Sequence, residues 1–257
     1  MNDPITNIAR FKDALKTIPA NEVPIIIPVF NLCSYADNMV QQLLSRGITS
    51  FIVCDNASTY PPMVEYLDKL STTQRVVRFS ENLGPRCFAE LPQMLAILPE
   101  YFIISDPDLV LNPNLPPDFI DKMKDVINAH NVSKAGFALD IYDTCHKFFN
   151  TAQVHKWEGK NWEIKVPQLS NCVLDDIYRA PLDTTFCLFK KSIYFREFFS
   201  IGFGITATSS LRIAGRFTCE HMGWWENQPV PKDEMDHYKN TQRWSSTCDE
   251  KTKLGYN

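Results

Sequence analysis

The sequence predicts an α/β fold in which a mostly parallel sheet is flanked by helices. Apolar strand-like runs alternate with helix-like segments through the first half of the chain, as expected of consecutive βαβ units. The chain has 257 residues, of which 44% are hydrophobic and 22% charged, so it can bury one sizeable core. Polar loops follow the predicted strands, at the edge of the sheet where α/β proteins bind ligands.

The first βα unit begins with the run 23–29 (VPIIIPV), which is rich in β-branched residues. A short apolar run of this kind is typical of a buried strand in a parallel sheet. Residues 35–46 then carry apolar side chains at helical spacing and end before Gly47, which predicts a helix. The connecting loop begins with Phe30 and Asn31.

The βα pattern occurs twice more before the middle of the chain. The second unit has a predicted strand over 50–54 and a helix over 62–70. The third has a predicted strand over 75–79 and a helix over 86–98. Asp55 directly follows the second strand, so its carboxylate is expected at the same edge of the sheet as the first loop.

A fourth predicted strand, 101–104 (YFII), leads directly into the segment SDPD. Two carboxylates separated by one residue on a tight turn can hold a divalent cation beside a diphosphate. We therefore expect Asp106 and Asp108 to bind Mn²⁺ or Mg²⁺. The carboxyl ends of parallel strands share one edge, so this turn should face the loops of Asn31 and Asp55.

The second half of the chain is predicted to be irregular and aromatic. A helix is expected over 118–130, and strands are expected over 135–141 and 184–189. No repeat or low-complexity linker separates the halves, so we interpret residues 1–257 as one domain. Residues 241–257 are interpreted as a tail.

Composition excludes some partners. The formal net charge is -4 and the sequence pI is about 5.8, so no diffuse positive field attracts nucleic acid. Residues 1–20 lack the apolar core of a signal peptide, and no run of ~20 apolar residues is long enough to span a membrane. We expect a cytoplasmic protein, with peripheral contact at a membrane left open.

The cysteines do not form a metal or redox motif. None of them falls in a CxxC pair, and no second pair of soft ligands accompanies Cys219 and His221 as a structural zinc site requires. We expect mostly buried thiols in a reducing compartment. The eight cysteines are Cys33, Cys54, Cys87, Cys145, Cys172, Cys187, Cys219 and Cys248.

Four segments together resemble the successive signatures of family 2-like glycosyltransferases with the GT-A fold: VPIIIPVFN, FIVCDNAST, RFSENLGPR and FIISDPDL. The resemblance covers about residues 22–115 and extends more loosely to Tyr238. It implies a GT-A domain with a nucleotide-sugar-binding lobe over about 22–115 and a loop-rich acceptor-binding lobe over about 116–240. The implied activity is metal-dependent hexosyl transfer in polysaccharide biosynthesis. The donor would be a nucleotide sugar, with a UDP-sugar favoured, and the acceptor a saccharide or lipid-linked saccharide.

The resemblance also implies site residues. In such enzymes the loop after the first strand and the acidic residue after the second hold the base and ribose, and a distant histidine often completes the metal site. The segment from Cys219 to Trp225 (CEHMGWW) resembles such a histidine block. The implied metal ligands are Asp106, Asp108 and His221. The implied donor-binding residues are Pro28, Phe30, Asn31, Asp55, Asn82, Arg86 and Asp106.

Several of these residues also have an ordinary structural interpretation. Arg86 lies at a predicted helix start and could bind nearby carbonyls or an exposed carboxylate. Asp55 could form an Asx turn or a helix cap. A histidine in an aromatic segment such as that of His221 is often structural.

Transfer with inversion requires a base near the acceptor hydroxyl, usually a carboxylate. The Glu-Asp signature that is usual in the family is missing, so the base has to be sought elsewhere. Asp183 is preferred because the segment from Ala180 to Phe186 (APLDTTF) resembles one that borders the acceptor in related enzymes. Asp140 and Glu158 are the alternatives, and a retaining mechanism stays open.

Three other classes of protein compete with this interpretation. A nucleotide-sugar-binding protein without catalytic activity would share the donor residues. A sugar-phosphate nucleotidyltransferase would have a glycine-rich loop after the first strand, where this chain has PVFN. A haloacid-dehalogenase-type phosphatase would have its DxD after the first strand rather than the fourth, and ranks lowest.

Overall fold

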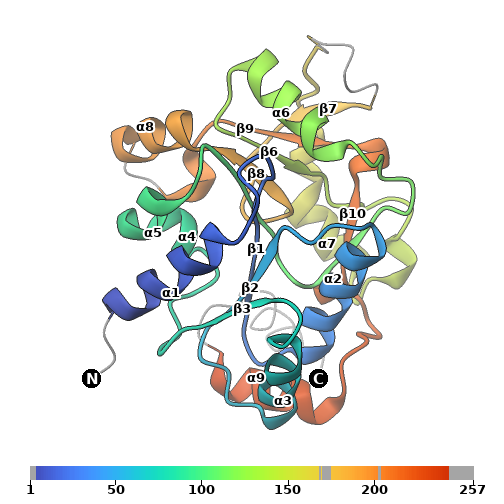
Figure 1. Cartoon of the computed structure of the whole chain (residues 1–257). Coiled ribbons are helices and arrows are strands. Elements are labelled where there is room, and N and C mark those ends of the chain that lie inside the picture. The colour runs from blue at the N-terminus through green and yellow to red at the C-terminus, as the bar shows by residue number, and fades with distance from the viewer. Residues whose placement is uncertain (1–3, 168, 170–174, 202–203, 243–257) are drawn as a thin grey trace.

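The computed structural model describes residues 4–167, 169, 175–201 and 204–242. Within these residues, eight strands form one sheet that crosses the molecule (Figure 1). The strands are β1 (Ile25–Val29), β2 (Phe51–Asp55), β3 (Arg75–Arg78), β4 (Tyr101–Ile104), β6 (Lys134–Phe137), β7 (Ile177–Arg179), β8 (Cys187–Lys190) and β9 (Ser210–Ile213). Their order is β3-β2-β1-β4-β8-β6-β9-β7.

The sheet is mostly parallel, which confirms the predicted α/β class. β1 pairs in parallel with β2 and with β4, β2 pairs in parallel with β3, and β6 does so with β9. The exception at the centre is β8, which is antiparallel to both β4 and β6. Because β8 runs the opposite way, the segment before it lies at the carboxyl end of β4, beside the Asp106-Pro107-Asp108 turn.

Alternate residues of the central strands point into two separate cores. In β1, Ile25 and Ile27 pack into one core while Ile26 packs into the other, and all three are fully buried. This alternation is the period-2 pattern of a strand covered on both faces.

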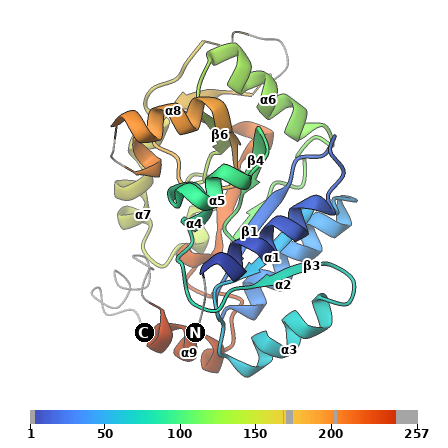
Figure 2. The same cartoon turned by 60° about the vertical axis from the view of Figure 1, so that its left-hand side comes forward.

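Helices cover both faces of the sheet. The core of Ile25 includes buried residues of α2 (Cys33–Ser45), α3 (Pro61–Leu70) and α6 (Phe119–His130). The core of Ile26 includes buried residues of α1 (Pro4–Lys16), α4 (Cys87–Glu90), α5 (Pro92–Ile97) and α8 (Lys191–Ile201). Figure 2 shows α1, α4 and α5 in front of the strands.

Two helical features differ from expectation. The helix predicted over 86–98 is two short helices, because Pro92 forces the preceding Leu91 into an extended conformation with ψ 117°. The helix α1 was not predicted, since its apolar residues are sparse. It is anchored by Phe11, whose ring is fully buried 4.7 Å from that of Phe88.

The second half is loop-rich, as predicted, but it also supplies β6, β7, β8 and β9. The strand expected over 135–141 ends at Phe137, and the one expected over 184–189 begins at Cys187. A separate two-stranded sheet joins β5 (Leu109–Leu111) to β10 (Cys219–His221). The remaining helices include α7 (Thr151–Glu158) and α9 (Lys232–Thr241).

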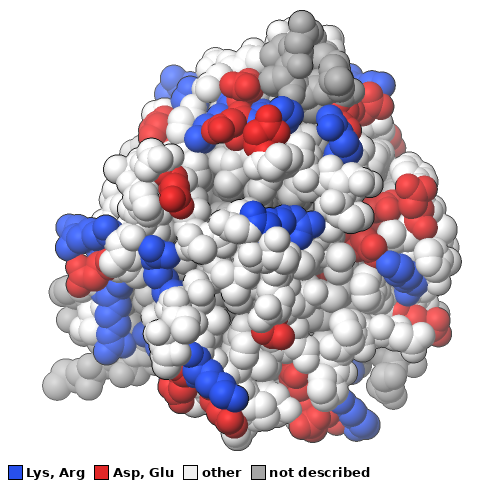
Figure 3. Space-filling model, turned by 45° about the vertical axis from the view of Figure 1, so that its right-hand side comes forward, with Lys and Arg blue, Asp and Glu red and all other residues white. Residues whose placement is uncertain are grey.

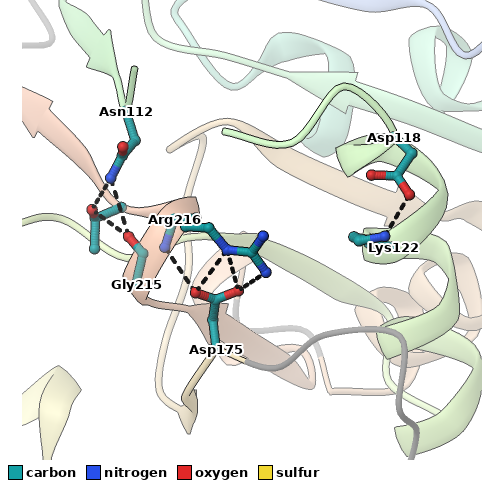
Figure 4. Close-up of polar contacts among 7 residues, drawn as sticks. Asn112, Asp118, Lys122, Asp175, Gly215 and Arg216 are labelled. Atoms are coloured by element: carbon teal, nitrogen blue, oxygen red, sulfur yellow. Dashed lines mark hydrogen bonds and ion pairs between the residues drawn. The ribbon is translucent and has the colours of Figure 1, made fainter. Parts of the chain in front are cut away.

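Hydrogen bonds of Asp175 and Asn112 hold the turn that precedes β10, and we call these two residues with Arg216 the polar latch (Figure 4). Asp175 accepts hydrogen bonds from the Arg216 backbone N–H and from its guanidinium, both at 2.9 Å. Gly215 has φ +62° and lies so close to Asp175 that a Cβ would collide with that carboxylate. Asn112, the residue after β5, donates to the Thr218 hydroxyl at 3.0 Å. The latch therefore sets where β10 begins.

Positive and negative side chains are mixed on the surface. Figure 3 shows Lys and Arg scattered among Asp and Glu on the face that it presents. No helix within the described residues is both long and apolar enough to cross a membrane.

The described cysteines are free thiols. Of these, Cys54, Cys87, Cys187 and Cys219 are buried and Cys33 and Cys145 are half-buried, while Cys172 and Cys248 lie outside the described residues.

Candidate active site

The predicted metal-binding turn lies between two sheets. β4 belongs to the main sheet and β5 to the small one, so the chain changes direction at Asp106-Pro107-Asp108. Asp106 is held from the side by Thr184, whose hydroxyl donates to Asp106 Oδ1 at 2.6 Å. In return, the Asp106 N–H donates to the Thr184 carbonyl at 3.1 Å. The carboxylate of Asp106 is thus fixed in orientation.

The structure brings Asp108 and His221 together across the β5-β10 sheet. Leu109 is paired with His221, and the Met222 N–H donates to the Asp108 carbonyl at 2.8 Å. The imidazole Nε2 of His221 lies 3.4 Å from Asp108 Oδ2. Both side chains are mostly buried, with exposures of 17% and 18%.

A glycine makes room for this pair. A Cβ at Gly223 would lie 2.6 Å from His221 Cε1, closer than real contacts allow, and 3.1 Å from Asp108 Oδ2, which is a tight contact. The imidazole also stacks on Trp224, with ring centroids 4.8 Å apart. The His221 ring is therefore held between the Trp224 ring and the main chain at Gly223.

Asp183 faces the same turn from the other side. One of its oxygens forms an ion pair with Arg86, and the other, Oδ1, is buried without a hydrogen-bond partner. Burial raises the pKa of Asp106 well above its usual range, helped by the negative charges of Asp108 and Asp183 and opposed by the hydrogen bond from Thr184. Crowded carboxylates of this kind favour binding of a cation.

Buried polar atoms without partners gather around this turn. Besides Asp183 Oδ1, they include His221 Nδ1 and the hydroxyl of Tyr35. The pKa of Tyr35 is raised by burial and by the negative charge of Asp108. Buried polar groups are normally hydrogen-bonded, so a cluster of unpaired ones indicates a site for an ion or ligand. Tyr35 was missed in the sequence because it fits the apolar spacing of a helix.

The residue types fit Mn²⁺ or Mg²⁺, whose ligands are oxygen and, for Mn²⁺, also imidazole nitrogen. Among the described residues, no three His, Cys, Asp or Glu side chains are grouped as a ready-made metal centre. A cation bound by one or two carboxylates together with substrate phosphates does not need such a group. Binding of the cation by Asp106, Asp108 and His221 stays a prediction.

Asn31, which is predicted to bind the nucleotide sugar, is turned into the protein. It links the loop after β1 to residues 59–60 and to the end of α9. It is fully buried with φ +53°, and its Oδ1 accepts from the N–H groups of Thr59 at 2.7 Å and Tyr60 at 2.9 Å. Its Nδ2 donates to the Thr241 hydroxyl at 2.9 Å. Asn31 therefore shapes the donor loops, while direct contact with a ligand stays a prediction.

Asp55 and Asn82 both form local turns at strand ends. Asp55 is buried at the end of β2 and accepts from the Ser58 N–H at 2.9 Å, and burial raises its pKa. Asn82 accepts from the Gly84 N–H at 2.9 Å. Asp55 therefore has the local structural role that its sequence also suggested, by bonding the backbone three residues on, and its role in ribose binding stays a prediction.

The two other predicted donor residues lie in β1 and just after it. Pro28 is buried within β1, opposite Cys54 of β2. Phe30 is half-buried, with its ring edge-on to Tyr238 at 6.4 Å. Tyr238 belongs to α9, so this helix reaches the loop after β1.

The helix α9 lies across the loops after β1 and β2. The Glu234 carboxylate accepts from the Ser34 N–H at 2.8 Å and from its hydroxyl at 2.9 Å. Tyr60 donates to Asp233 at 2.6 Å, and the Thr59 hydroxyl lies 3.0 Å from a His237 ring nitrogen. Figure 1 shows α9 next to α3 at this end of the molecule.

The other two candidate bases are engaged elsewhere. Asp140 accepts from the N–H groups of Tyr142 at 3.0 Å and Asp143 at 3.1 Å, which is an Asx turn. Glu158 is buried, where it forms an ion pair with Arg212 and accepts from Asn161. Asp183 differs from both in having a buried oxygen that is unpaired.

Comparison with known proteins gives only distant likenesses. No protein-family model and no curated sequence matches the chain. One solved structure that matches is GalNAc-T7 with UDP, GalNAc and Mn²⁺ (TM-score 0.49, 14% identity, 86% of this chain and 48% of that one). Another is glucosyl-3-phosphoglycerate synthase from Mycobacterium tuberculosis with Mn²⁺ and UDP-glucose (TM-score 0.39, 14% identity, 89% and 78%).

A third match is TarS from S. aureus (TM-score 0.34, 17% identity, 46% of this chain). The chain spans 22% of the length of TarS and 48% of that of GalNAc-T7. TM-scores below 0.5 at these identities are too low to support a function.

Proposed function

We propose that this protein is a metal-dependent glycosyltransferase that moves a hexosyl group from a nucleotide sugar, with a UDP-sugar favoured, to a saccharide or lipid-linked saccharide. The observation that carries the proposal is the set of unpaired buried atoms around two carboxylates. Tyr35, Asp183 and His221 each leave a buried polar atom without a partner beside the Asp106-Pro107-Asp108 turn. A divalent ion with a diphosphate would satisfy such a set.

The proposed roles follow from where the side chains lie. Asp106, Asp108 and His221 would hold the cation, Mn²⁺ or Mg²⁺, which would supply positive charge for a departing diphosphate. Arg86 is half exposed beside Asp183, so its guanidinium can reach a phosphate oxygen at the mouth of the site.

Asp183 is the proposed base of an inverting reaction. Its carboxylate takes the proton of the acceptor hydroxyl while that oxygen bonds to the anomeric carbon and the diphosphate departs. The ion pair with Arg86 keeps the Asp183 carboxylate close to Asp106 before substrate binds. Asp55 is proposed to hold the ribose, and Phe30, Asn31 and Pro28 to shape the base pocket, with Asn82 shaping the loop before Arg86.

The deciding experiment measures thermal stabilisation by UDP-, GDP- and CMP-sugars with and without Mn²⁺, since a ligand that binds the native state raises its melting temperature. Stabilisation that requires both a nucleotide sugar and Mn²⁺ is expected. Asp108→Asn should abolish it and abolish transfer. The control is Asp125→Asn, an exposed carboxylate on α6. If Asp108→Asn behaves like the control, the proposal is wrong.

A second candidate is a nucleotide-sugar-binding protein without transferase activity. The ion pair of Asp183 with Arg86 favours it, because this carboxylate is partly neutralised before any acceptor arrives. The two candidates differ in turnover. A transferase turns over with an acceptor, and Asp183→Asn then lowers kcat far more than it weakens donor binding. A binding protein gives no turnover with any acceptor, whether or not Asp183 is changed.

A further inference from the structure

Three consecutive carbonyls before Asp183 are each held by a buried side chain. Ser210 Oγ donates to the Ala180 carbonyl at 2.7 Å. Arg212 Nε donates to the Pro181 carbonyl at 3.0 Å. Lys134 Nζ donates to the Leu182 carbonyl at 2.7 Å. We call residues 180–182 the strap. The donors come from β9 and β6, which are neighbours in the sheet.

Lys134 is unusual for a residue in the middle of a sheet. Its side chain is fully buried, and its ammonium also donates to the Ile205 carbonyl. The rings of Phe189 and Tyr194 lie 5.8 Å and 5.9 Å from Nζ. Burial lowers the pKa of Lys134 to about 8. Removing an ammonium from water costs several kcal/mol, which carbonyls and ring faces offset in part.

Arg212 is a second buried charge that holds the strap. Its guanidinium forms the ion pair with Glu158, and both side chains are only 8% exposed. Asn161 donates to the remaining Glu158 oxygen at 2.9 Å. Replacing a buried ion pair with apolar residues is often neutral or stabilising. Stability alone therefore gives little reason for two buried cations, Lys134 and Arg212, to bind the strap.

The strap leads directly into the active site. The next two residues are Asp183, with its unpaired oxygen, and Thr184, which holds Asp106 through two hydrogen bonds. A shift of the Leu182 carbonyl would move both side chains, because they are one and two residues away along the chain.

We propose that Lys134 is a positioning residue which, with Ser210 and Arg212, holds the strap so that Asp183 and Thr184 face Asp106. This inference rests on the proposed function for its catalytic meaning. Lys134 touches neither substrate nor metal and acts through Leu182.

The test compares two lysines whose ammonium groups each donate to two carbonyls at different places. Lys134→Met removes the ammonium under the strap. Lys191→Met is the matched control, because Lys191 Nζ donates to two carbonyls, Ala96 and Leu98, each at 2.7 Å, at the other end of β8. Hydrogen exchange of the ligand-free proteins is measured at the Asp106 amide, which donates to Thr184. Exchange at least tenfold faster is expected in Lys134→Met and unchanged exchange in Lys191→Met.

The second readout is the Mn²⁺ concentration that gives half of the thermal stabilisation by UDP. It should rise at least tenfold in Lys134→Met and stay within twofold in Lys191→Met. Wild-type values of both readouts in a folded Lys134→Met protein would overturn the inference.

If Lys134→Met does not fold, Ser210→Ala replaces it, since it removes one hydrogen bond to the strap. Its control is Ser133→Ala, which removes a hydrogen bond of 2.6 Å to the Ser209 carbonyl. Faster exchange of the Asp106 amide only in Ser210→Ala supports the inference, and equal exchange in the two variants overturns it. The exchange is measured without ligand. A wild-type protein that binds neither Mn²⁺ nor any nucleotide sugar would instead refute the proposed function.

Discussion

Glu158 illustrates how a single residue changes its meaning once its surroundings are known. In the sequence it is a carboxylate next to Trp157, in a stretch that could border a sugar. In the structure it pairs with Arg212, which is 54 residues away in the chain. Burial raises the pKa of Glu158, while the positive charge of Arg212 and the Asn161 hydrogen bond lower it. Sequence spacing carries no information on such a distant partner.

The pair predicts a large effect on stability. Glu158→Leu leaves the Arg212 guanidinium buried without its partner, so the free energy of unfolding should fall by about 3–5 kcal/mol in urea denaturation. Adding Arg212→Met should restore part of this loss. If Glu158→Gln instead keeps wild-type stability and donor binding but loses turnover, Glu158 is the base and the role given to Asp183 is wrong.

Lys134 predicts a pH dependence. Its pKa is lowered from 10.5 to about 8 by burial, so between these values the unfolded chain binds a proton that the folded protein does not. The contribution of Lys134 to the free energy of unfolding therefore rises with pH from about 8 to 10.5, by at most ~1.4 kcal/mol per pH unit. The same contribution is lost as the pH falls from 10.5 through 8.

The measurement is the difference in unfolding free energy between wild type and Lys134→Met across this range. A difference that does not change with pH would show that Lys134 titrates normally.

At the scale of elements, the pairing of β5 with β10 brings two of the proposed metal ligands together. Asp108 immediately precedes β5 and His221 ends β10, so the antiparallel register places them side by side. The sequence singled out both residues as candidate ligands, His221 through a family resemblance, but it did not predict the strands that bring them together. Each strand has only three residues, too few for a periodic pattern.

Gly223 gives a prediction at this scale. Gly223→Ala should displace the His221 ring, because its Cβ would lie 2.8 Å from Nδ1. The Mn²⁺ concentration for half-maximal stabilisation by UDP should rise at least tenfold. The matched control is Gly159→Ala, where the added Cβ meets nothing within 4 Å. Equal Mn²⁺ dependence in the two variants would remove His221 from the metal site.

The first four strands show what local pattern can predict. Their buried β-branched runs are visible in the sequence, and their parallel pairing places Asp55 and Asp106 at the same edge. The position of β8 was beyond such reasoning, since its antiparallel course between β4 and β6 depends on long-range pairing. The strap was missed for the same reason, because its donors lie before and after it in the chain.

At the scale of the whole molecule, α9, the last described helix, packs on the first loops of the sheet. Glu234 is 3% exposed and binds the start of α2 through Ser34. Phe30, Thr59 and Tyr60 also contact this helix. The loops proposed to hold the nucleotide are therefore completed by a helix that lies about 200 residues away in the chain.

Loosening α9 should consequently weaken nucleotide binding. Glu234→Ala is expected to raise hydrogen exchange at the Ser34 amide and to weaken UDP binding at least fivefold by calorimetry. Asp236→Ala, which removes only an exposed pair with Lys232, should change neither. UDP affinity that stays at the wild-type value in a Glu234→Ala protein with faster Ser34 exchange would show that α9 does not shape the nucleotide site.

The insertion of β8 between β4 and β6 also affects how the chain is made. During synthesis β1 to β4 emerge first, and β4 then has an open strand edge until β8 has left the ribosome. An uncovered apolar edge is a template for pairing with other chains. Nascent or truncated chains that end before Cys187 should therefore aggregate or require a chaperone, although they contain Asp106 and Asp108.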